Sequence, residues 1–389
     1  MRTIILVLVI AAIVGSIYYL NSTKTPIAAP QNGSVESLEI SVPPRATSPL
    51  SAETVITLAE RVAQKEKKFE RGKEIVSPSG FINADKFALK DLVGKKVILI
   101  DFWTYSCINC IRTFPYLNAW YDKYKDRGLE IVGIHTPEFE FEKKYDNVAT
   151  AVKNFGIKYP VVLDNDYATW FAYKNRYWPR EYLIDIDGFI VHDHIGEGSY
   201  EETESEIQKA LAERALVLGE NEKIAKETVR PTGVIAVNPG APLSPEIYFG
   251  AARNEYLGNG ARRVNGPQTL TEPSVIKLNT PYLVGDWNFT EQYAENKSSA
   301  AKIIFKYQAK NVYLVAGASV PVTIKILKDG KSLGDSDKGE DVVIKNGESA
   351  VAIQAERLYK LIQGADWGEH TIELIIESPG VRTFTFTFG

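Results

Sequence analysis

The chain is poor in cysteine and histidine, the side chains that most often build disulfide frameworks and zinc sites. Its 389 residues include two cysteines and four histidines. Two cysteines are too few for a disulfide framework, and two thiols do not complete a tetrahedral zinc site. No histidine stands at a zinc-finger spacing from them. His192 and His194 alternate on one expected strand face, but no third ligand is evident, so we expect no metal.

The chain also lacks an excess of either charge. Lysine and arginine number 45 against 49 aspartates and glutamates, which leaves a formal net charge of -4. A balance this close to neutral gives no reason to expect a nucleic acid or an anionic membrane surface as a partner. The hydrophobic content of 44% is that of an ordinary globular protein, and 389 residues exceed one ordinary domain. We therefore expect two domains.

One long apolar run lies near the N-terminus, from Ile4 to Leu20. As a helix it would rise roughly 25 Å, close to the hydrocarbon core of about 30 Å. Arg2 makes the leading flank positive, which keeps that flank cytoplasmic and directs the rest outward. A cleaved signal peptide is the alternative, although the run is long for one and no clear cleavage motif follows. We expect residues 1–21 to be a single transmembrane anchor and the body to be extracytoplasmic, periplasmic or at the cell surface.

Two segments have the composition of connections. Residues 22–76 begin with a tether in which prolines lie among small and polar residues, as in an extended linker. Apolar residues at helical spacing then predict a helix over Ala52–Arg71 with a solvated face rich in Lys and Glu. A hinge is expected at residues 219–243, and its first part is rich in Lys and Glu.

Strands and helices alternate between residues 77 and 218. The apolar run Val97–Trp103 predicts a buried strand, and a helix is expected from Cys107 to about Lys125. The other expected strands are Leu129–His135, Tyr159–Leu163, Glu181–Ile184 and Phe189–His192, and the other helices are Val148–Phe155, Asp166–Tyr173 and Glu201–Arg214. This alternation predicts an α/β sheet covered by helices on both faces.

Residues 244–389 have a different pattern, with short alternating segments and almost no helical periodicity. Turn signals such as Asn346-Gly347 separate the segments. The expected strands are Ile303–Tyr307, Val312–Val315, Val322–Leu327, Val342–Ile344, Ala350–Ala355, Thr371–Ile376 and Thr383–Phe388. Many short strands without helices predict an all-β sandwich.

Both cysteines lie where the first buried strand passes into a helix, as Cys107-Ile108-Asn109-Cys110. At the helix N-terminus, unpaired N–H groups and the helix dipole would stabilise the thiolate of Cys107. Cys110 lies one turn later and is expected to be more buried. We therefore expect Cys107 to attack a target disulfide and Cys110 to resolve the mixed disulfide, closing a Cys107–Cys110 bond. A purely structural disulfide in so small a loop would stabilise little.

Around this motif the sequence resembles thioredoxin. Asp101-Phe102-Trp103 before Cys107, and Pro115 after Cys110, are similar to the thioredoxin active-site strand and helix, and Trp178-Pro179 resembles its cis-proline loop. Over residues 78–218 the chain resembles the DipZ-like branch of the TlpA-type thioredoxins. The segments that carry this likeness are 102–112, 135–139, 164–170 and 175–179. The region after Ser244 resembles the β-domain, similar to carbohydrate-binding modules, of some of those proteins.

The resemblance implies a thioredoxin-like fold with a central mixed sheet and an extracytoplasmic thiol–disulfide oxidoreductase. It implies no cofactor beyond the redox-active Cys107–Cys110 disulfide and proteins with disulfides or dithiols as clients. Asp101 would be a buried acid that takes the proton of Cys110, or else a solvated or hydrogen-bonded strand carboxylate. Pro179 would face the disulfide, and Trp178, Trp103 and Tyr105 would contact the client. With a single span, the chain would receive electrons from a separate membrane protein.

Two other functions compete with this interpretation. A thiol peroxidase of the peroxiredoxin type fits Thr104, three residues before Cys107, but Ile100 stands where that family has proline. The second alternative is a glycan-binding surface protein with a vestigial redox domain. The aromatic residues that would then stack on sugars are Trp287, Trp367, Tyr307 and Tyr313. Sandwich cores also use aromatic residues, so core packing is the competing explanation for them.

The direction of electron flow is predicted from the residues between the cysteines. Ile108-Asn109 has no histidine that would further stabilise the Cys107 thiolate, so a reductase is favoured over a strong oxidant. Haem-site thiols of apocytochrome c are one candidate client. Arg112 is a candidate for steering acidic or thiolate partners, or is simply solvated, and His135 is expected to be structural.

Overall fold

The computed structural model describes residues 57–221, 223–235 and 243–389. The expected anchor, the proline-rich tether, the first part of the expected Ala52–Arg71 helix and residues 236–242 of the hinge lie outside these ranges. Within them, no helix combines the length and the apolar character needed to cross a membrane.

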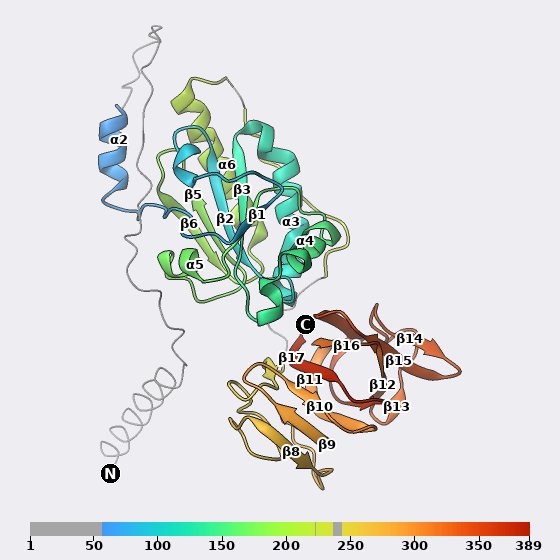
Figure 1. The fold of residues 1–389 in the computed structure, drawn as a ribbon. Helices are drawn as coiled ribbons and strands as arrows, with labels where there is room; N and C mark the ends of the chain where they lie inside the picture. The colour runs from blue at the N-terminus through green and yellow to red at the C-terminus, as the bar shows by residue number, and fades with distance from the viewer. Residues whose placement is uncertain (1–56, 222, 236–242) are drawn as a thin grey trace, which may run out of the picture. The chain divides into compact units, whose positions relative to one another are not determined.

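Residues 77–218 form the expected mixed sheet (Figure 1). Its six strands lie in the order β1-β4-β3-β2-β5-β6. Strands β2, β3 and β4 are parallel, while β1, β5 and β6 run antiparallel to their neighbours. The strands are β1 Gly80–Ile82, β2 Val97–Trp103, β3 Leu129–His135, β4 Val161–Leu163, β5 Arg180–Ile184 and β6 Ile190–Ile195. Every residue of β2 is buried, as its continuous apolar run predicts.

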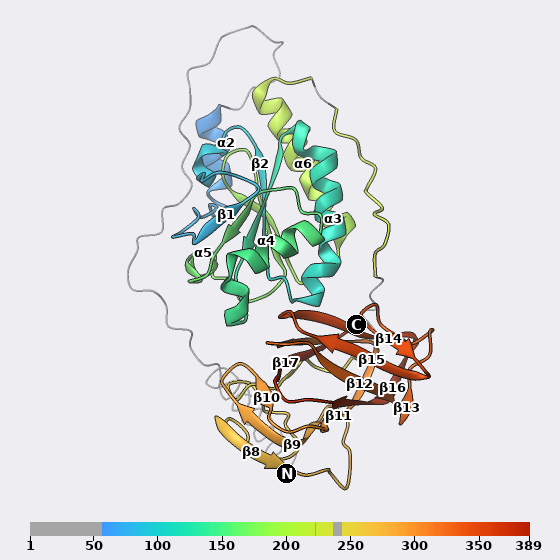
Figure 2. The ribbon, with the colours of Figure 1, turned by 45° about the vertical axis from the view of Figure 1, so that its right-hand side comes forward.

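Helices cover both faces of this sheet, as expected. The helices are α3 Ile108–Tyr124, α4 Tyr145–Asn154, α5 Ala168–Ala172 and α6 Tyr200–Leu218, with short 3-10 turns η1 Leu89–Asp91, η2 Lys125–Arg127 and η3 Glu140–Lys143. Helices α3, α4 and α6 share one hydrophobic cluster with Leu99 and Leu183, whereas α5 packs with Ile98 and Ile100 on the other face (Figure 2). Side chains alternate along a strand, so Asp101 lies on the α3 and α6 face with Leu99.

Helix α2, Leu58–Lys65, is shorter than the expected helix Ala52–Arg71 at its C-terminal end. It begins with a capping box in which Thr57 and Glu60 satisfy each other's backbone N–H groups. It ends early because the chain after it pairs as an extended segment, with Gly72 N–H donating to Gly188 O and Ile190 N–H to Glu70 O.

Lys65 links α2 to the α/β domain through ion pairs. Its Nζ lies 2.5 Å from Asp185, 2.9 Å from Asp187 and 2.6 Å from Glu213, so an ammonium group occupies the centre of these three carboxylates. Burial raises the pKa of Asp187, but hydrogen bonds from Arg61 and Lys65 outweigh it and hold that pKa below its ordinary value. Asp185 is fully buried, and burial keeps its pKa raised in spite of the bond from Lys65.

Replacing Lys65 with methionine should lower the free energy of unfolding by about 2 kcal/mol near neutral pH, because three neighbouring carboxylates lose their common cation. A carboxyl group whose pKa is lowered in the fold stabilises the protein above its unfolded pKa and loses that contribution as the pH falls. The difference between variant and wild type should therefore shrink below about pH 4. Urea unfolding measures it, with the exposed Lys67→Met as the control. Equal effects of both substitutions would contradict this role of Lys65.

The region 244–389 is all-β, as expected, and its strands form one connected sheet. The strands are β7 Ile247–Tyr248, β8 Gly266–Leu270, β9 Pro281–Phe289, β10 Ala294–Asn296, β11 Ala301–Ala318, β12 Val322–Lys328, β13 Lys331–Ser332, β14 Val343–Lys345, β15 Glu348–Ile353, β16 Arg357–Ile376 and β17 Val381–Phe388. The sequence pattern missed β7 to β10 and β13. It also divided β11 in two and found only the C-terminal part of β16.

Strand β11 continues through a point where the sequence suggests a break. Its first half pairs with β9 and its second half with β17, while β16 follows both halves. The register shifts between Ala309 and Asn311, and the polar pair Lys310-Asn311 at that irregularity resembles a turn. Strands that pass in this way from one half of a sheet to the other can enclose one core. A hydrophobic cluster lies there, with Phe305, Leu314 and Phe386 among its members.

Candidate functional site

Cys107 and Cys110 lie at the start of α3, at the end of the sheet where β2 stops. Cys107 is the N-cap residue of α3, and the N–H of Cys110 donates to its Sγ at 3.3 Å. Both are free thiols, Cys107 partly exposed and Cys110 fully buried. The expected positions of the two thiols at a helix N-terminus, one accessible and one buried, are confirmed.

The two thiols differ in their surroundings. Burial raises the pKa of Cys110 well above its ordinary value, and the hydrogen bond and charge of Cys107 and the charge of Asp101 raise it further. Cys110 therefore keeps its proton until a base removes it. Cys107 is partly exposed at the N-cap of α3, where its Sγ accepts a hydrogen bond from the N–H of Cys110. This difference supports the assignment of Cys107 as the attacking thiol, which stays a prediction.

Asp101 is the buried acid nearest this pair in the sequence. It is 1% exposed, and neither carboxylate oxygen has a hydrogen-bond partner within residues 57–221, 223–235 and 243–389. Burial raises the pKa of Asp101 well above its ordinary value, with a further contribution from Glu181. The expected burial is confirmed and a solvated carboxylate is excluded. Its role as the acceptor of the Cys110 proton remains a prediction.

The Trp178–Pro179 peptide bond is cis, as expected. Strand β5 begins at Arg180, which lies opposite Phe102 on β2, so this loop stands at the same end of the sheet as Cys107. The ring of Trp178 is half-buried against Trp170, with ring centroids 4.3 Å apart. The neighbouring Tyr177, which the sequence did not single out, is 49% exposed. The aromatic surface open to a client in this loop is therefore shared between Trp178 and Tyr177.

The expectation that Trp103 and Tyr105 contact a client is wrong. Trp103 is fully buried because the strand alternation directs it beneath α3, where it packs edge-on against Phe114 at 5.1 Å. Tyr105 is 5% exposed and stacks on His135 at 5.8 Å, and its hydroxyl donates to the carbonyl of Glu356 at 3.3 Å. Both rings are therefore part of the core next to the thiol site, packed on Phe114 and His135.

Glu142 is a positioning residue that the sequence analysis missed. It is fully buried, and its carboxylate accepts hydrogen bonds from the N–H and hydroxyl of Ser106 at 3.2 and 2.7 Å. Its other oxygen accepts from the N–H groups of Glu138 and Phe139 at 2.6 and 2.9 Å. Glu142 therefore holds the turn immediately before Cys107. Nothing distinguishes it in the sequence from the other acids between positions 138 and 142.

Arg112 and His135 are both structural in this fold. Arg112 is 4% exposed and forms two hydrogen bonds of 2.7 Å with Glu197, so it is neither solvated nor free to steer partners. Burial lowers the pKa of His135 to about 3, which makes it a neutral side chain, and its Nε2 lies 3.5 Å from Thr104 Oγ1. The expected structural role of His135 is consistent with this contact.

Most of the aromatic residues considered for sugar stacking belong to the core of the β-domain. Trp287 and Tyr307 are fully buried, and Tyr313 is 3% exposed. Trp367 alone of the four is partly exposed. Core packing therefore explains three of these residues.

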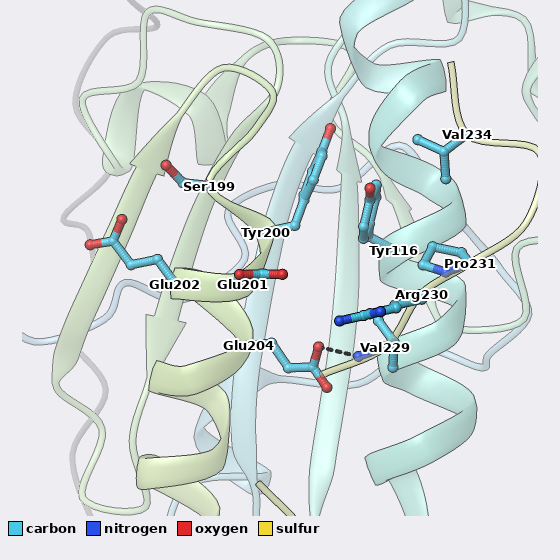
Figure 3. Close-up of a pocket in the computed structure, with 10 residues that line it drawn as sticks. All are labelled: Tyr116, Ser199, Tyr200, Glu201, Glu202, Glu204, Val229, Arg230, Pro231 and Val234. Atoms are coloured by element: carbon cyan, nitrogen blue, oxygen red, sulfur yellow. Dashed lines mark hydrogen bonds between the residues drawn. The ribbon is translucent and has the colours of Figure 1, made fainter. Parts of the chain in front are cut away.

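A cavity of about 430 Å³ lies beside α3 and α6, away from the thiols (Figure 3). Tyr116 and Tyr200 stack in its wall with ring centroids 3.6 Å apart, and Glu204 accepts from the N–H of Val229 at 2.7 Å. The other lining residues are Ser199, Glu201, Glu202, Arg230, Pro231 and Val234. Neither cysteine lines this cavity, so it is not part of the thiol site.

Two protein families match the chain in the regions where the two domains lie. The family described as Redoxin matches residues 83–211, and the family described as Thioredoxin like C-terminal domain matches residues 244–389. Among solved structures, the solution structure of a thioredoxin-like protein in the oxidised form is 28% identical and covers 37% of this chain and 97% of its own, with a TM-score of 0.35.

Several curated proteins are also similar to this chain. Protein DipZ of Mycobacterium tuberculosis is 37% identical over 303 residues, which are 77% of this chain and 40% of DipZ. The chain thus spans about 40% of the length of that relative. Thiol-disulfide oxidoreductase ResA of Bacillus cereus is 36% identical over 157 residues, 39% of this chain and 86% of ResA. The chain therefore belongs to the thioredoxin-like thiol–disulfide oxidoreductases of the DipZ and ResA type.

Proposed function

We propose that this oxidoreductase reduces disulfides of exported proteins, with Cys107 as the attacking thiol and Cys110 as the resolving thiol. The contrast between a partly exposed Cys107 at a helix N-terminus and a buried, protonated Cys110 carries the proposal. The residues between them, Ile108 and Asn109, include no histidine that would make the pair strongly oxidising.

The reaction takes place in two exchanges. The Cys107 thiolate attacks a client disulfide, an S–S bond forms between Cys107 and the client, and the first client sulfur leaves as a thiolate. Cys110 then loses its proton and attacks Cys107 Sγ, which releases the second client sulfur and closes the Cys107–Cys110 disulfide. Two electrons pass from the enzyme to the client. Asp101, on the same face of β2 as the neighbouring thiol helix, is the base for the second exchange.

The setting of this reaction belongs to the same proposal. The apolar run Ile4–Leu20 supports a single membrane anchor that holds the catalytic domain outside the cytoplasm. A separate membrane protein would then reduce the Cys107–Cys110 disulfide after each turnover. Apocytochrome c haem-site thiols are one client class that such a reductase serves, and partly exposed Trp367 is the residue at which the β-domain would contact a glycan.

The full chain should reduce insulin disulfides, and its dithiol should equilibrate with glutathione at a potential below about −200 mV, more reducing than the oxidising members of the superfamily. Cys107→Ser should abolish the activity. A potential near −120 mV with net oxidation of reduced clients would reverse the proposed direction. Turnover of hydrogen peroxide faster than insulin reduction would favour a peroxidase instead.

A further inference from the structure

Residues 138–142, the bridging segment, contact both the thiol site and the β-domain. On one side, the buried carboxylate of Glu142 accepts the hydrogen bonds of Ser106, the residue immediately before Cys107. On the other side lie residues of the β-domain, and the described parts of both domains belong to one compact unit. The proposed thiol mechanism uses no residue of the β-domain, so these contacts require their own explanation.

Charged and polar contacts join the bridging segment to the β-domain. Oε1 of Glu138 accepts hydrogen bonds from Nη1 of Arg253 at 2.6 Å and from the hydroxyl of Tyr248 at 2.8 Å. The guanidinium group of Arg253 also lies over the Tyr248 ring, 3.7 Å from its centroid. A second contact joins the backbone, where the N–H of Glu140 donates to Oε1 of Gln292 at 2.9 Å. The β-domain thus binds both the side chain and the main chain of this segment.

Aromatic packing accompanies these polar contacts. The ring of Phe384, on β17, meets Phe139 and Phe141 edge to face, with centroids 5.1 and 4.8 Å apart. All three rings are buried. Next to the bridging segment, the hydroxyl of Tyr105 donates to the carbonyl of Glu356. Buried rings in this geometry attract one another in addition to excluding water, so the β-domain holds the segment in one position.

A continuous row of hydrogen bonds runs from the β-domain to the turn before Cys107. The side chain of Glu138 accepts from Arg253, and the N–H of Glu138 donates to Oε2 of Glu142 at 2.6 Å. Oε1 of Glu142 accepts both bonds from Ser106. The first link joins a guanidinium to a carboxylate, a kind of hydrogen bond that is shorter and stronger than a neutral one. A shift of Glu138 would therefore be transmitted to Ser106.

We propose that the β-domain sets the position of the Cys107 thiol, with Arg253 as a positioning residue that acts through Glu138 and Glu142. While the row is intact, the turn at Ser106 is fixed and Cys107 keeps its place at the N-cap of α3. Without Arg253 the bridging segment can shift, and the thiol spends less time in the orientation from which it attacks a disulfide. The inference rests on the proposed attack by Cys107.

The reaction of the reduced full chain with 5,5′-dithiobis(2-nitrobenzoate) separates the two exchanges, because Cys107 releases the first thionitrobenzoate and Cys110 the second. Arg253→Gln should slow the first release about three- to tenfold at neutral pH, because it loosens the turn that orients the attacking sulfur. Arg253→Lys keeps a cationic donor beside Glu138 and should recover most of the rate.

Two comparisons separate positioning from general damage to the interface. Lys144→Gln removes a different ion pair with the β-domain, to Glu356 at 3.0 Å, and should leave the first release unchanged because that pair lies outside the row. In a double-mutant cycle, Arg253→Gln combined with Glu142→Gln should react no more slowly than Glu142→Gln alone, because the row is already broken at Glu142. Independent effects on folding would multiply instead.

Several outcomes would overturn the inference. A first release at the wild-type rate in Arg253→Gln, or equal slowing in Lys144→Gln, would show that Arg253 does not position the thiol. Effects that multiply in the double variant would do the same. Should Glu142→Gln fold poorly, Ser106→Ala, which removes one hydrogen bond to that carboxylate, takes its place in the cycle. A wild-type first release that does not depend on Cys107 would instead reject the proposed function.

Discussion

Replacing Cys110 with serine should turn the enzyme into a covalent trap for its clients. Cys107 still attacks, but no second thiol resolves the mixed disulfide, so trapped complexes should exceed those of Cys107→Ser by at least about tenfold. The asymmetry follows from position, because Cys107 is partly exposed at the first turn of α3 whereas Cys110 is fully buried. Non-reducing electrophoresis after incubation with an oxidised client, followed by mass spectrometry of the linked peptides, measures the trapped fraction.

The variant with both cysteines replaced by serine is the control for complexes that form without thiol exchange. The disulfide-linked peptide from the Cys110→Ser protein should contain Cys107. Equal amounts of trapped client from the two single variants would reject the assigned roles. Cys110 could attack a client only if its thiol were exposed, and in this structure it is fully buried.

Asp101→Asn should change activity and stability in opposite directions. Loss of the base beneath Cys110 should slow resolution of the mixed disulfide about 10- to 100-fold. The same change should raise the free energy of unfolding at neutral pH by about 1–3 kcal/mol, because burial penalises the ionised form of the carboxyl group, whereas an amide has no ionised form. Thionitrobenzoate release and urea unfolding give the two readouts.

The stability effect should depend on pH in a defined direction. Burial raises the pKa of Asp101, so the folded state holds a proton that the unfolded state loses near its ordinary pKa of about 3.9. Wild-type stability therefore falls, relative to the asparagine variant, as the pH rises from about 4 through the raised pKa. The exposed Asp166→Asn is the control. A variant that is slower and also less stable would indicate simple damage to the core rather than the loss of a base.

Local sequence patterns predicted the elements that place the thiols. The bounds of β2 and β3 agree with the apolar runs from which they were predicted, because a strand buried on both faces reads as a continuous hydrophobic stretch. The position of Cys107 at the N-cap of α3 was predictable for the same reason, since the cysteines follow directly after such a strand. The helical spacing predicted a helix that continues beyond the end of α2. Residues Glu70–Gly72 instead pair with Gly188–Ile190, a long-range contact that local spacing does not reveal.

The residues around the thiols depended on the tertiary structure. Glu181 is 80 positions from Asp101 in the chain, and only the register of β2 with β5 makes them neighbours. The positioning role of Glu142 follows only from the tertiary structure, in which its carboxylate accepts hydrogen bonds from the N–H and hydroxyl of Ser106. Trp103 and Tyr105 adjoin Cys107 in sequence, yet packing against Phe114 and His135 buries them. Adjacency in sequence therefore did not predict exposure.

The sequence alone determined the chemistry of this protein: a Cys107–Cys110 pair at a strand-to-helix junction, in a chain with no other thiol. Those features are local, because helix capping and buried-strand patterns act over a few residues. The tertiary structure alone decided which groups serve that chemistry. Strand register sets Glu181 opposite Asp101, and the fold brings the Glu142 carboxylate to Ser106, in the turn before Cys107. Such contacts join residues far apart in the chain, and they arise from burial of a common core that no local pattern encodes.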